Sequence, residues 1–173
     1  MILVSYDGSA DAHAAIDRAA QLMPGAEATV LTVWEPFMDA LARSGSMGMG
    51  MGMGMTGAYA DGNPEKIDAT SRAAALAAAA EGAQRATAAG LVARSRAESR
   101  DAGIANTILV AAADLDADLI VMGTRGLSGV KSFLLGSVSH AVVQHADRAV
   151  LVVPSPAVAE RRHVHLDRDA APA

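Results

Sequence analysis

The sequence contains no cysteine in its 173 residues. Disulfide bonds, thiolate-bound metal centres and cysteine nucleophiles are therefore excluded. Aromatic residues make up only 3% of the chain, which argues against a surface that stacks the bases of a nucleic acid. An excess of positive charge is also missing, because the formal net charge is −5 and no basic stripe is present. We therefore expect no binding of DNA or RNA, although a single nucleotide held by backbone groups suits this charge.

The sequence also lacks an apolar run long enough to cross a membrane. Its alanine-rich run, Ala73–Ala80, is too short and is flanked by Arg72 and Glu81. The N-terminus has no charged lead, and Asp7 interrupts its apolar residues early, so the sequence predicts no signal peptide. We therefore expect a cytoplasmic protein without a membrane partner.

Several familiar catalytic and cofactor motifs are absent or misplaced. No G-x-x-x-x-G-K-[ST] occurs, which excludes a P-loop NTPase. Gly52-x-Gly54-x-x-Gly57 has the letters of the dinucleotide fingerprint, but it lies well past a strand and opens onto no helix, so we discard it. His140 and His145 are not spaced to meet on one helix face, and no Ser–His–Asp arrangement follows from the spacing.

What the chain does contain is a regular alternation of strand and helix patterns. Short apolar or β-branched runs alternate with segments whose apolar residues recur every three or four positions, and this order is typical of an α/β fold. Such a fold has a parallel sheet with helices on both faces. The expected strands are 1–5, 29–34, 91–99, 118–122 and 149–153, and the expected helices cover about 10–23, 38–43, 64–89, 104–115 and 137–146.

Two of these elements carry further information. The first helix has an apolar stripe that includes Ala15 and Ile16, and we expect Asp11 and Asp17 on its other side. The run from residue 91 to residue 99 alternates charged with small side chains, which is typical of an edge strand with one wet face.

The strongest functional pattern lies between Asp118 and Val153. A buried strand is followed by Gly123, Gly126 and Gly136, and Ser137 then begins a helix. Helix N-termini present unpaired N–H groups and partial positive charge, which suits a phosphate. The glycines allow positive φ and close approach of a ligand, and the serine stands where a helix is capped. The alternative is a tight strand–helix connection that needs glycines only to turn.

This spacing, Gly123-x2-Gly126-x9-Gly136-Ser137, resembles the nucleotide-binding signature of the universal stress protein family. The apolar run that ends at Pro154 resembles the C-terminal end of that family as well. The family's nucleotide-binding members wrap the phosphates of ATP in this loop. One departure is the absence of the Gly-x-Pro that is common in the family before the helix at residue 104.

The resemblance covers about residues 1–154, apart from a methionine–glycine segment. It implies a single α/β domain, an open parallel five-stranded sheet of the adenine nucleotide alpha hydrolase-like kind with strand order 3-2-1-4-5. Ligands of such sheets bind beyond the carboxyl ends of the strands, where the order reverses. In this order the reversal lies between the first and the fourth strand, so the turn at Asp7 and the loop at Gly123 meet there.

The resemblance also implies ATP, or ADP or AMP, as the ligand, with Mg²⁺. It assigns Asp7 a contact to the ribose or, through Mg²⁺, to a phosphate; hydrogen bonding within its own turn is the alternative. It assigns the backbone of Val33 to the adenine. Arg125 and Lys131 either pair with the outer phosphates or are ordinary solvated charges. The expected nucleotide-binding residues are Asp7, Val33, Gly123, Arg125, Gly126, Gly136, Ser137 and Ser139.

We identify no general base with an orienting partner, and hydrolysis needs one to position water. The expected function is therefore that of an ATP-binding universal stress protein, a nucleotide-dependent sensor or regulator in the stress response, and not of an enzyme. An ATP-dependent phosphotransferase or ATPase that uses Asp7 with Mg²⁺ is the alternative. The apolar last strand, Val150–Val153, is expected to pair with a second copy in a homodimer.

Two segments lie outside this scheme. In the stretch of about residues 45–57, five methionines from Met47 to Met55 alternate with glycine, which disfavours a strand and predicts a flexible loop. This loop is either a lid over the crevice or a binder of a soft cation such as Cu(I). Residues 155–173 have no periodicity and are interpreted as a flexible tail.

Overall fold

The computed structural model describes residues 1–45, 63–126 and 135–161. The methionine–glycine segment, Lys131 and residues 162–173 lie outside the described residues. Within the described ranges, strands alternate with helices as the sequence predicts, except that two helices lie between the second and third strands. They are β1 (Ile2–Ser5), α1 (Ala10–Leu22), β2 (Glu27–Trp34), α2 (Phe37–Gly45), α3 (Pro64–Ala88), β3 (Val92–Ser99), α4 (Ile104–Asp114), β4 (Leu119–Gly123), α5 (Ser137–His145) and β5 (Ala149–Val153).

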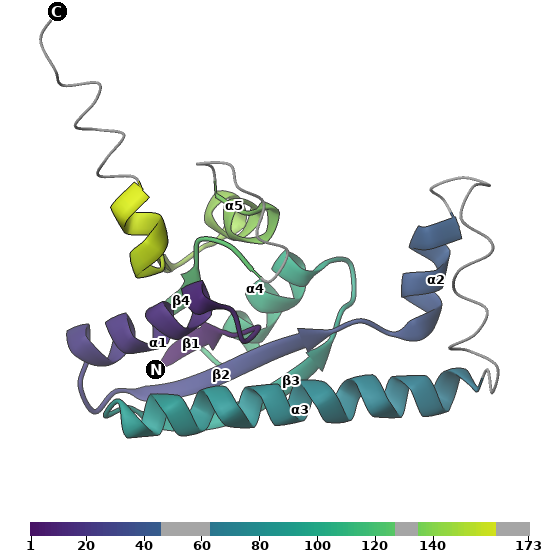
Figure 1. The fold of residues 1–173 in the computed structure, drawn as a ribbon, viewed down its shortest axis with the longest axis horizontal. Coiled ribbons are helices and arrows are strands. Elements are labelled where there is room, and N and C mark those ends of the chain that lie inside the picture. The colour runs from purple at the N-terminus through teal and green to yellow at the C-terminus, as the bar shows by residue number, and fades with distance from the viewer. Residues whose placement is uncertain (46–62, 127–134, 162–173) are drawn as a thin grey trace, which may run out of the picture.

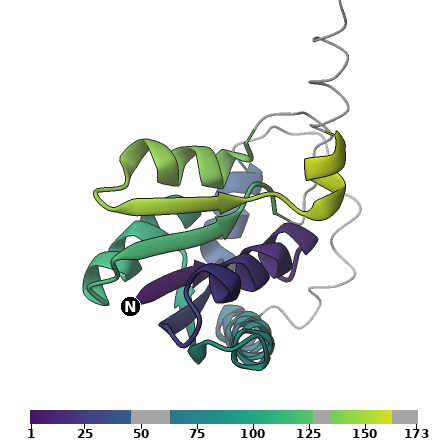
Figure 2. The same ribbon diagram turned by 90° about the vertical axis from the view of Figure 1, so that its left-hand side faces the viewer.

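The five strands form one parallel sheet in the order β3-β2-β1-β4-β5. This confirms the order that the family resemblance implies, and it confirms β3 as an edge strand. β5 forms the opposite edge (Figure 2). The order reverses between β1 and β4, which lie side by side with Val4 opposite Val121. The carboxyl ends of these two strands therefore open onto the same crevice.

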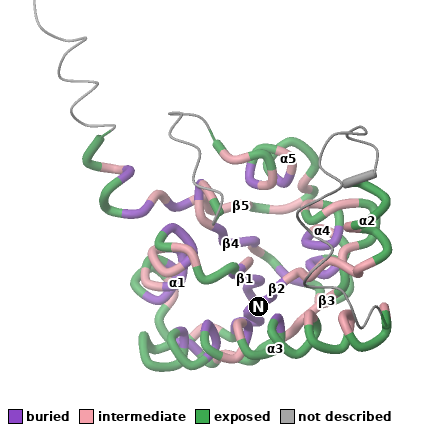
Figure 3. The backbone as a smooth tube through the Cα atoms, turned by 45° about the vertical axis from the view of Figure 1, so that its right-hand side comes forward, coloured by how far each residue is buried: buried purple, intermediate pink, exposed green. Residues whose placement is uncertain are grey.

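Helices cover both faces of the sheet. α1 and α3 pack on one face and α4 and α5 on the other (Figure 1). Each face has its own apolar core: Val4, Ile16 and Val30 are buried on the α1 side, and Leu3 and Ile120 on the α4 side. Figure 3 shows the buried residues gathered in the strands and on the inner sides of the helices.

Small residues let α3 approach the sheet closely. Ala79 and Ala86 of α3 are fully buried on the side of the helix that faces the sheet. A Cβ atom at Gly82 would lie 2.9 Å from the ring of Tyr6 and 2.8 Å from Val30. The helix begins where the sequence predicts, because Asn63 accepts a hydrogen bond from the N–H of Glu65 at 3.0 Å.

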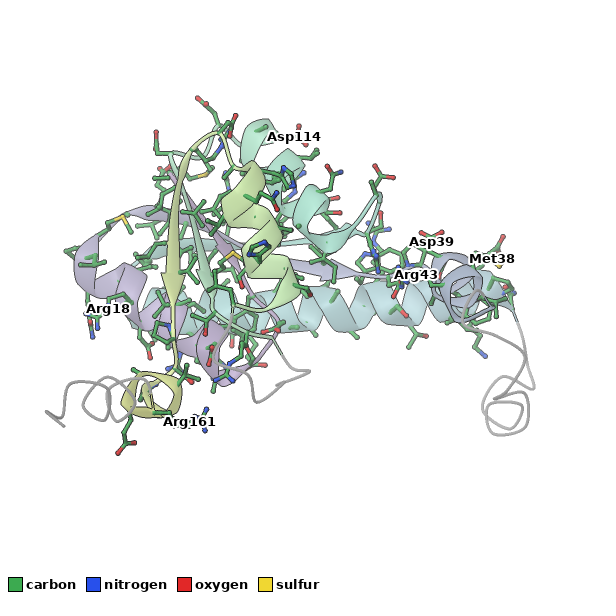
Figure 4. All side chains as sticks on the ribbon, turned by 90° about the horizontal axis from the view of Figure 1, so that it is seen from above. Arg18, Met38, Asp39, Arg43, Asp114 and Arg161 are labelled. Atoms are coloured by element: carbon green, nitrogen blue, oxygen red, sulfur yellow. The ribbon has the colours of Figure 1, made fainter. Side chains whose placement is uncertain are left out.

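The two ends of the long α3 have different surroundings. Its C-terminal half packs on β2 and β3, whereas its N-terminal half extends past the sheet and packs against α2. In Figure 4, Met38, Asp39 and Arg43 of α2 lie together at this far end. No helix within the described residues has both the length and the hydropathy that a membrane span requires.

The chain does not leave the body of the protein directly after β5. Residues 156–161 form a helix, and Val158 is buried at its centre. Arg161, at the end of this short helix, projects outward (Figure 4). The first part of the expected flexible tail, residues 155–161, is thus packed structure, because the buried Val158 anchors it.

Candidate functional site

A cavity of about 270 Å³ opens beyond the carboxyl ends of β1 and β4. All eight residues that the sequence nominates for nucleotide binding line it. They come from five places: the turn after β1, the end of β2, the end of β4, the segment that follows β4, and the N-terminus of α5. The other lining residues are Ser5, Tyr6, Ala12, Ile104, Met122 and Val138.

The turn after β1 forms one wall. Asp7 accepts a hydrogen bond from the N–H of Ser9 on Oδ1, at 3.0 Å. The local turn that we considered as the alternative role of Asp7 is therefore present. Its second oxygen, Oδ2, faces Gly126, where an added Cβ atom would lie only 2.5 Å from it. Gly8 makes this turn with φ of +79°.

The three signature glycines do not use the positive φ that glycine allows. The described residues with positive φ include neither Gly123, Gly126 nor Gly136. Gly123 is needed for packing, since a Cβ atom there would lie 2.7 Å from Cβ of Asp11 in α1. At Gly136 a Cβ atom would lie 3.2 Å from the carbonyl oxygen of Thr124. Close approach between segments of the chain, and not positive φ, explains Gly123 and Gly136.

The N-terminus of α5 forms the opposite wall. The expectation that Ser137 caps this helix is wrong: Gly136 is the N-cap residue, and it provides no side-chain cap. Ser137 is the first helical residue and is exposed at the cavity. Ser139 is buried, and its hydroxyl donates a bifurcated hydrogen bond to the carbonyl oxygens of Thr124 at 2.8 Å and Gly136 at 3.0 Å. Ser139 therefore holds the loop in shape.

Arg125 contributes both backbone and side chain to this region. It lines the cavity and is half-buried. Its carbonyl oxygen accepts a hydrogen bond from the hydroxyl of Ser9, at 3.4 Å, which links the segment after β4 to the start of α1. The same Ser9 hydroxyl accepts a hydrogen bond from the N–H of Ala12 at 3.2 Å, so Ser9 caps α1.

Sequence reasoning missed two residues beneath the cavity. Thr124 is 1% exposed, and its hydroxyl donates a hydrogen bond to Asp11. We expected Asp11 on the solvent side of α1, but it is only 5% exposed. The signal was available, because Asp11 stands four residues before Ala15 and eight before Ala19, on the same face of the helix.

The negative charge of the buried Asp11 is stabilised by its neighbours. Burial acts to raise the pKa of its carboxyl group, but hydrogen bonds from Ser155 and Thr124 and the positive charge of Arg125 outweigh burial. The pKa is therefore held below its ordinary value, and Asp11 is ionised at neutral pH.

Tyr6 carries the other perturbed group near the cavity. Burial and a hydrogen bond from its hydroxyl to Glu81, at 3.0 Å, raise the pKa of Tyr6 to about 12. The hydroxyl also lies 2.9 Å from Nε2 of His13. It is neutral at physiological pH and is bonded to residues of α1 and α3 that do not line the cavity. Among the described residues, no group of three or more His, Asp or Glu side chains is placed to hold a metal ion.

Comparisons with known proteins agree with this architecture. A sequence model of the universal stress protein family matches residues 1–154. A universal stress protein from Thermus aquaticus is 34% identical over 154 residues, which cover 88% of this chain and 96% of that protein. A relative from Staphylococcus saprophyticus is 57% identical over 42 residues, a match that spans 25% of the relative's length.

Solved structures show the same fold. The universal stress protein UspA from Lactobacillus plantarum is 25% identical, with a TM-score of 0.63 over 88% of this chain and 95% of that one. A universal stress protein in complex with cAMP is also 25% identical, with a TM-score of 0.56 over 89% of this chain and 95% of that one. The family match and the near full-length Thermus aquaticus relative together establish that the chain belongs to the universal stress protein family.

Proposed function

We propose that the cavity binds an adenine nucleotide, ATP with Mg²⁺, and that the protein acts as a nucleotide-dependent sensor or regulator in the stress response. The observation that carries this proposal is the convergence of the eight nominated residues on one cavity at the carboxyl ends of β1 and β4. A relative that is 25% identical forms a complex with cAMP, which supports an adenine nucleotide as the ligand.

The cavity has parts suited to each part of ATP. Val33, Ile104 and Met122 give it an apolar side for the base. The N-terminus of α5, which begins at Ser137, offers unpaired backbone N–H groups and the positive end of the helix dipole to the phosphates. Arg125 adds a positive side chain beside them.

Asp7 is the one carboxylate among the described residues that line the cavity. Mg²⁺ is commonly held by one or two carboxylates together with the phosphates of its nucleotide, so Asp7 fits that role or a contact to the ribose. Bound Mg²⁺ would neutralise phosphate charge. Oδ1 of Asp7 accepts from the N–H of Ser9 within the turn, and Oδ2 lies on the side of Gly126, which also lines the cavity.

The cavity is better suited to holding ATP than to hydrolysing it. A general base needs a second group that orients it towards the attacking water. The Tyr6 hydroxyl is neutral and engaged elsewhere, and Asp7 is bonded to its own turn. We therefore propose weak ATPase activity at most, and an ATP-dependent phosphotransferase or ATPase that uses Asp7 remains the competing function.

Calorimetric titration with ATP, ADP, AMP and GTP in the presence of Mg²⁺ tests both functions, with product release measured on the same samples. The proposal expects saturable binding of adenine nucleotides and turnover far below the rate of about 1 per second that is ordinary for enzymes. Turnover at that rate, lost in Asp7→Asn, would establish the competing enzyme. Absence of binding by every adenine nucleotide would refute the proposed function.

A further inference from the structure

Two buried polar side chains beneath the cavity, Asp11 and Thr124, join four segments of the chain. Thr124 is at the centre of this arrangement. Its N–H donates to the carbonyl oxygen of Val153 at 3.0 Å, at the end of β5. Its own carbonyl oxygen accepts from the N–H of Gly136 and from the hydroxyl of Ser139, both at 2.8 Å. One residue thus fixes the end of β4 to β5 and to the N-terminus of α5.

The Thr124 hydroxyl extends this network to α1. It donates to Oδ2 of Asp11, and the other carboxylate oxygen of Asp11 accepts from the N–H of Ser155 at 3.2 Å. Ser155 is buried and precedes the short helix of residues 156–161, whose Val158 N–H donates to the Ser155 carbonyl oxygen at 2.9 Å. The Asp11 carboxylate is therefore shared between the wall of the cavity and the segment after β5.

Nothing in the geometry makes Asp11 a ligand contact. It does not line the cavity, whereas Thr124 is followed directly by Arg125 and Gly126, which do. A carboxylate is costly to bury unless it is hydrogen-bonded, and both of its oxygens are bonded here. The buried carboxylate lies where the segments that form the cavity meet.

We propose that Asp11 is a positioning residue of the nucleotide site, which acts through Thr124 to hold the segment after β4 and the start of α5 in the binding arrangement. Through Ser155 the same carboxylate couples this arrangement to the docking of residues 155–161. The inference rests on the proposed nucleotide binding. Because coupling of two sites is reciprocal, an occupied cavity also holds the C-terminal segment more firmly.

The test compares Thr124→Val, which keeps the shape of the side chain but removes the hydroxyl, with Thr124→Ser, which keeps the hydroxyl. Asp11→Asn is a second variant of unchanged size. Asp17→Asn is the matched control, because it makes the same change on the same helix at a half-buried position outside this network, where the carboxylate pairs with Arg85. Affinity for ATP with Mg²⁺ is measured by calorimetry, and amide hydrogen exchange of residues 155–161 is measured with and without the nucleotide.

We expect Thr124→Val and Asp11→Asn to weaken binding about tenfold, the effect of losing roughly one hydrogen bond to a charged group. We also expect both variants to speed exchange at residues 155–161, and we expect Thr124→Ser and Asp17→Asn to resemble the wild type. In the wild type, the nucleotide should slow exchange in this segment.

Variants that lose thermal stability but bind ATP as the wild type does would overturn the positioning role, since a merely structural residue leaves affinity unchanged. Unchanged exchange of residues 155–161 in both variants would overturn the coupling, and this readout needs no nucleotide. A wild type that binds no adenine nucleotide would instead refute the proposed function, and the positioning role with it. The outcomes therefore distinguish the two proposals.

Discussion

Replacing Gly123 with alanine tests whether the signature glycines are needed for packing or for the ligand. The added Cβ atom would lie 2.7 Å from Cβ and 2.8 Å from the carbonyl carbon of Asp11. Ordinary carbon contacts are about 3.5–4.0 Å, so α1 and β4 must separate by about 1 Å. The obstacle is the backbone and Cβ of Asp11 on the buried face of α1, which cannot rotate out of the way.

The size of the effect follows from two opposing terms. Overpacking of this kind costs roughly 1–3 kcal/mol, and the lower flexibility of the unfolded chain returns about 0.4–1 kcal/mol. The free energy of unfolding should therefore fall by roughly 1–2 kcal/mol. For a chain of this length that is a loss of about 2–8 °C in Tm.

Gly126→Ala is the matched comparison. Among the described residues, its added Cβ atom would approach only the Asp7 carboxyl group, with Oδ2 at 2.5 Å, and this is the end of a side chain that can turn away. We expect stability within about 1 kcal/mol of the wild type, because strain and the entropic gain are both small. The displaced carboxylate should weaken nucleotide binding about tenfold, a change of roughly 1.4 kcal/mol.

Urea unfolding of the nucleotide-free variants measures the first effect. The single tryptophan, Trp34, reports it by fluorescence, since it ends β2 beside the cavity-lining Val33. Calorimetric titration with ATP measures the second effect. A Gly123→Ala variant as stable as the wild type would refute the packing argument. Loss of ATP binding in that stable variant would show that this glycine is there for the ligand.

Three further outcomes are expected. Val152→Lys should convert the proposed homodimer to monomers in sedimentation analysis, because it puts a charge on the apolar edge strand β5; a monomeric wild type at high concentration would refute the dimer. Tyr6→Phe should cost about 1 kcal/mol of stability in urea unfolding through its lost bonds to Glu81 and His13, and a large change in nucleotide affinity would contradict this. The pKa of Asp11 is lowered on folding, so its contribution to the free energy of unfolding is present above the unfolded pKa of about 3.9 and is lost as pH falls through the folded pKa. Thermal melts of Asp11→Asn should therefore show less destabilisation by acid than those of the wild type.

The fold could be predicted from the sequence because its local signals agree with one another. The start of α3 is an example: Asn63 caps the helix and Pro64 is its first residue, as the pattern predicts. Strand order is different, because it depends on how the crossovers run and not on the residues within each strand. The order β3-β2-β1-β4-β5 was therefore available only from the family resemblance.

The sequence predicted which residues belong to the candidate site, but not the backbone positions and hydrogen bonds that hold them there. The spacing from Gly123 to Ser137, together with the family resemblance, identified eight of the residues that line the cavity. It did not show that Gly136 would take the cap position or that Ser139 would be turned inward to Thr124. Those details depend on which segments of the chain approach each other, and a pattern of letters does not encode that distance.

Asp11 shows how a helix pattern can reveal more than its apolar residues. In α1 the acid stands on the same face as Ala15 and Ala19, so its burial follows from the 3.6-residue period. A buried carboxylate needs donors, and the short side chains of an alanine face supply none. The donors must come from other elements, here Thr124 beyond β4 and Ser155 beyond β5. An acid on the buried face of the first helix therefore predicts a polar contact at the carboxyl ends of the neighbouring strands, where the nucleotide is proposed to bind.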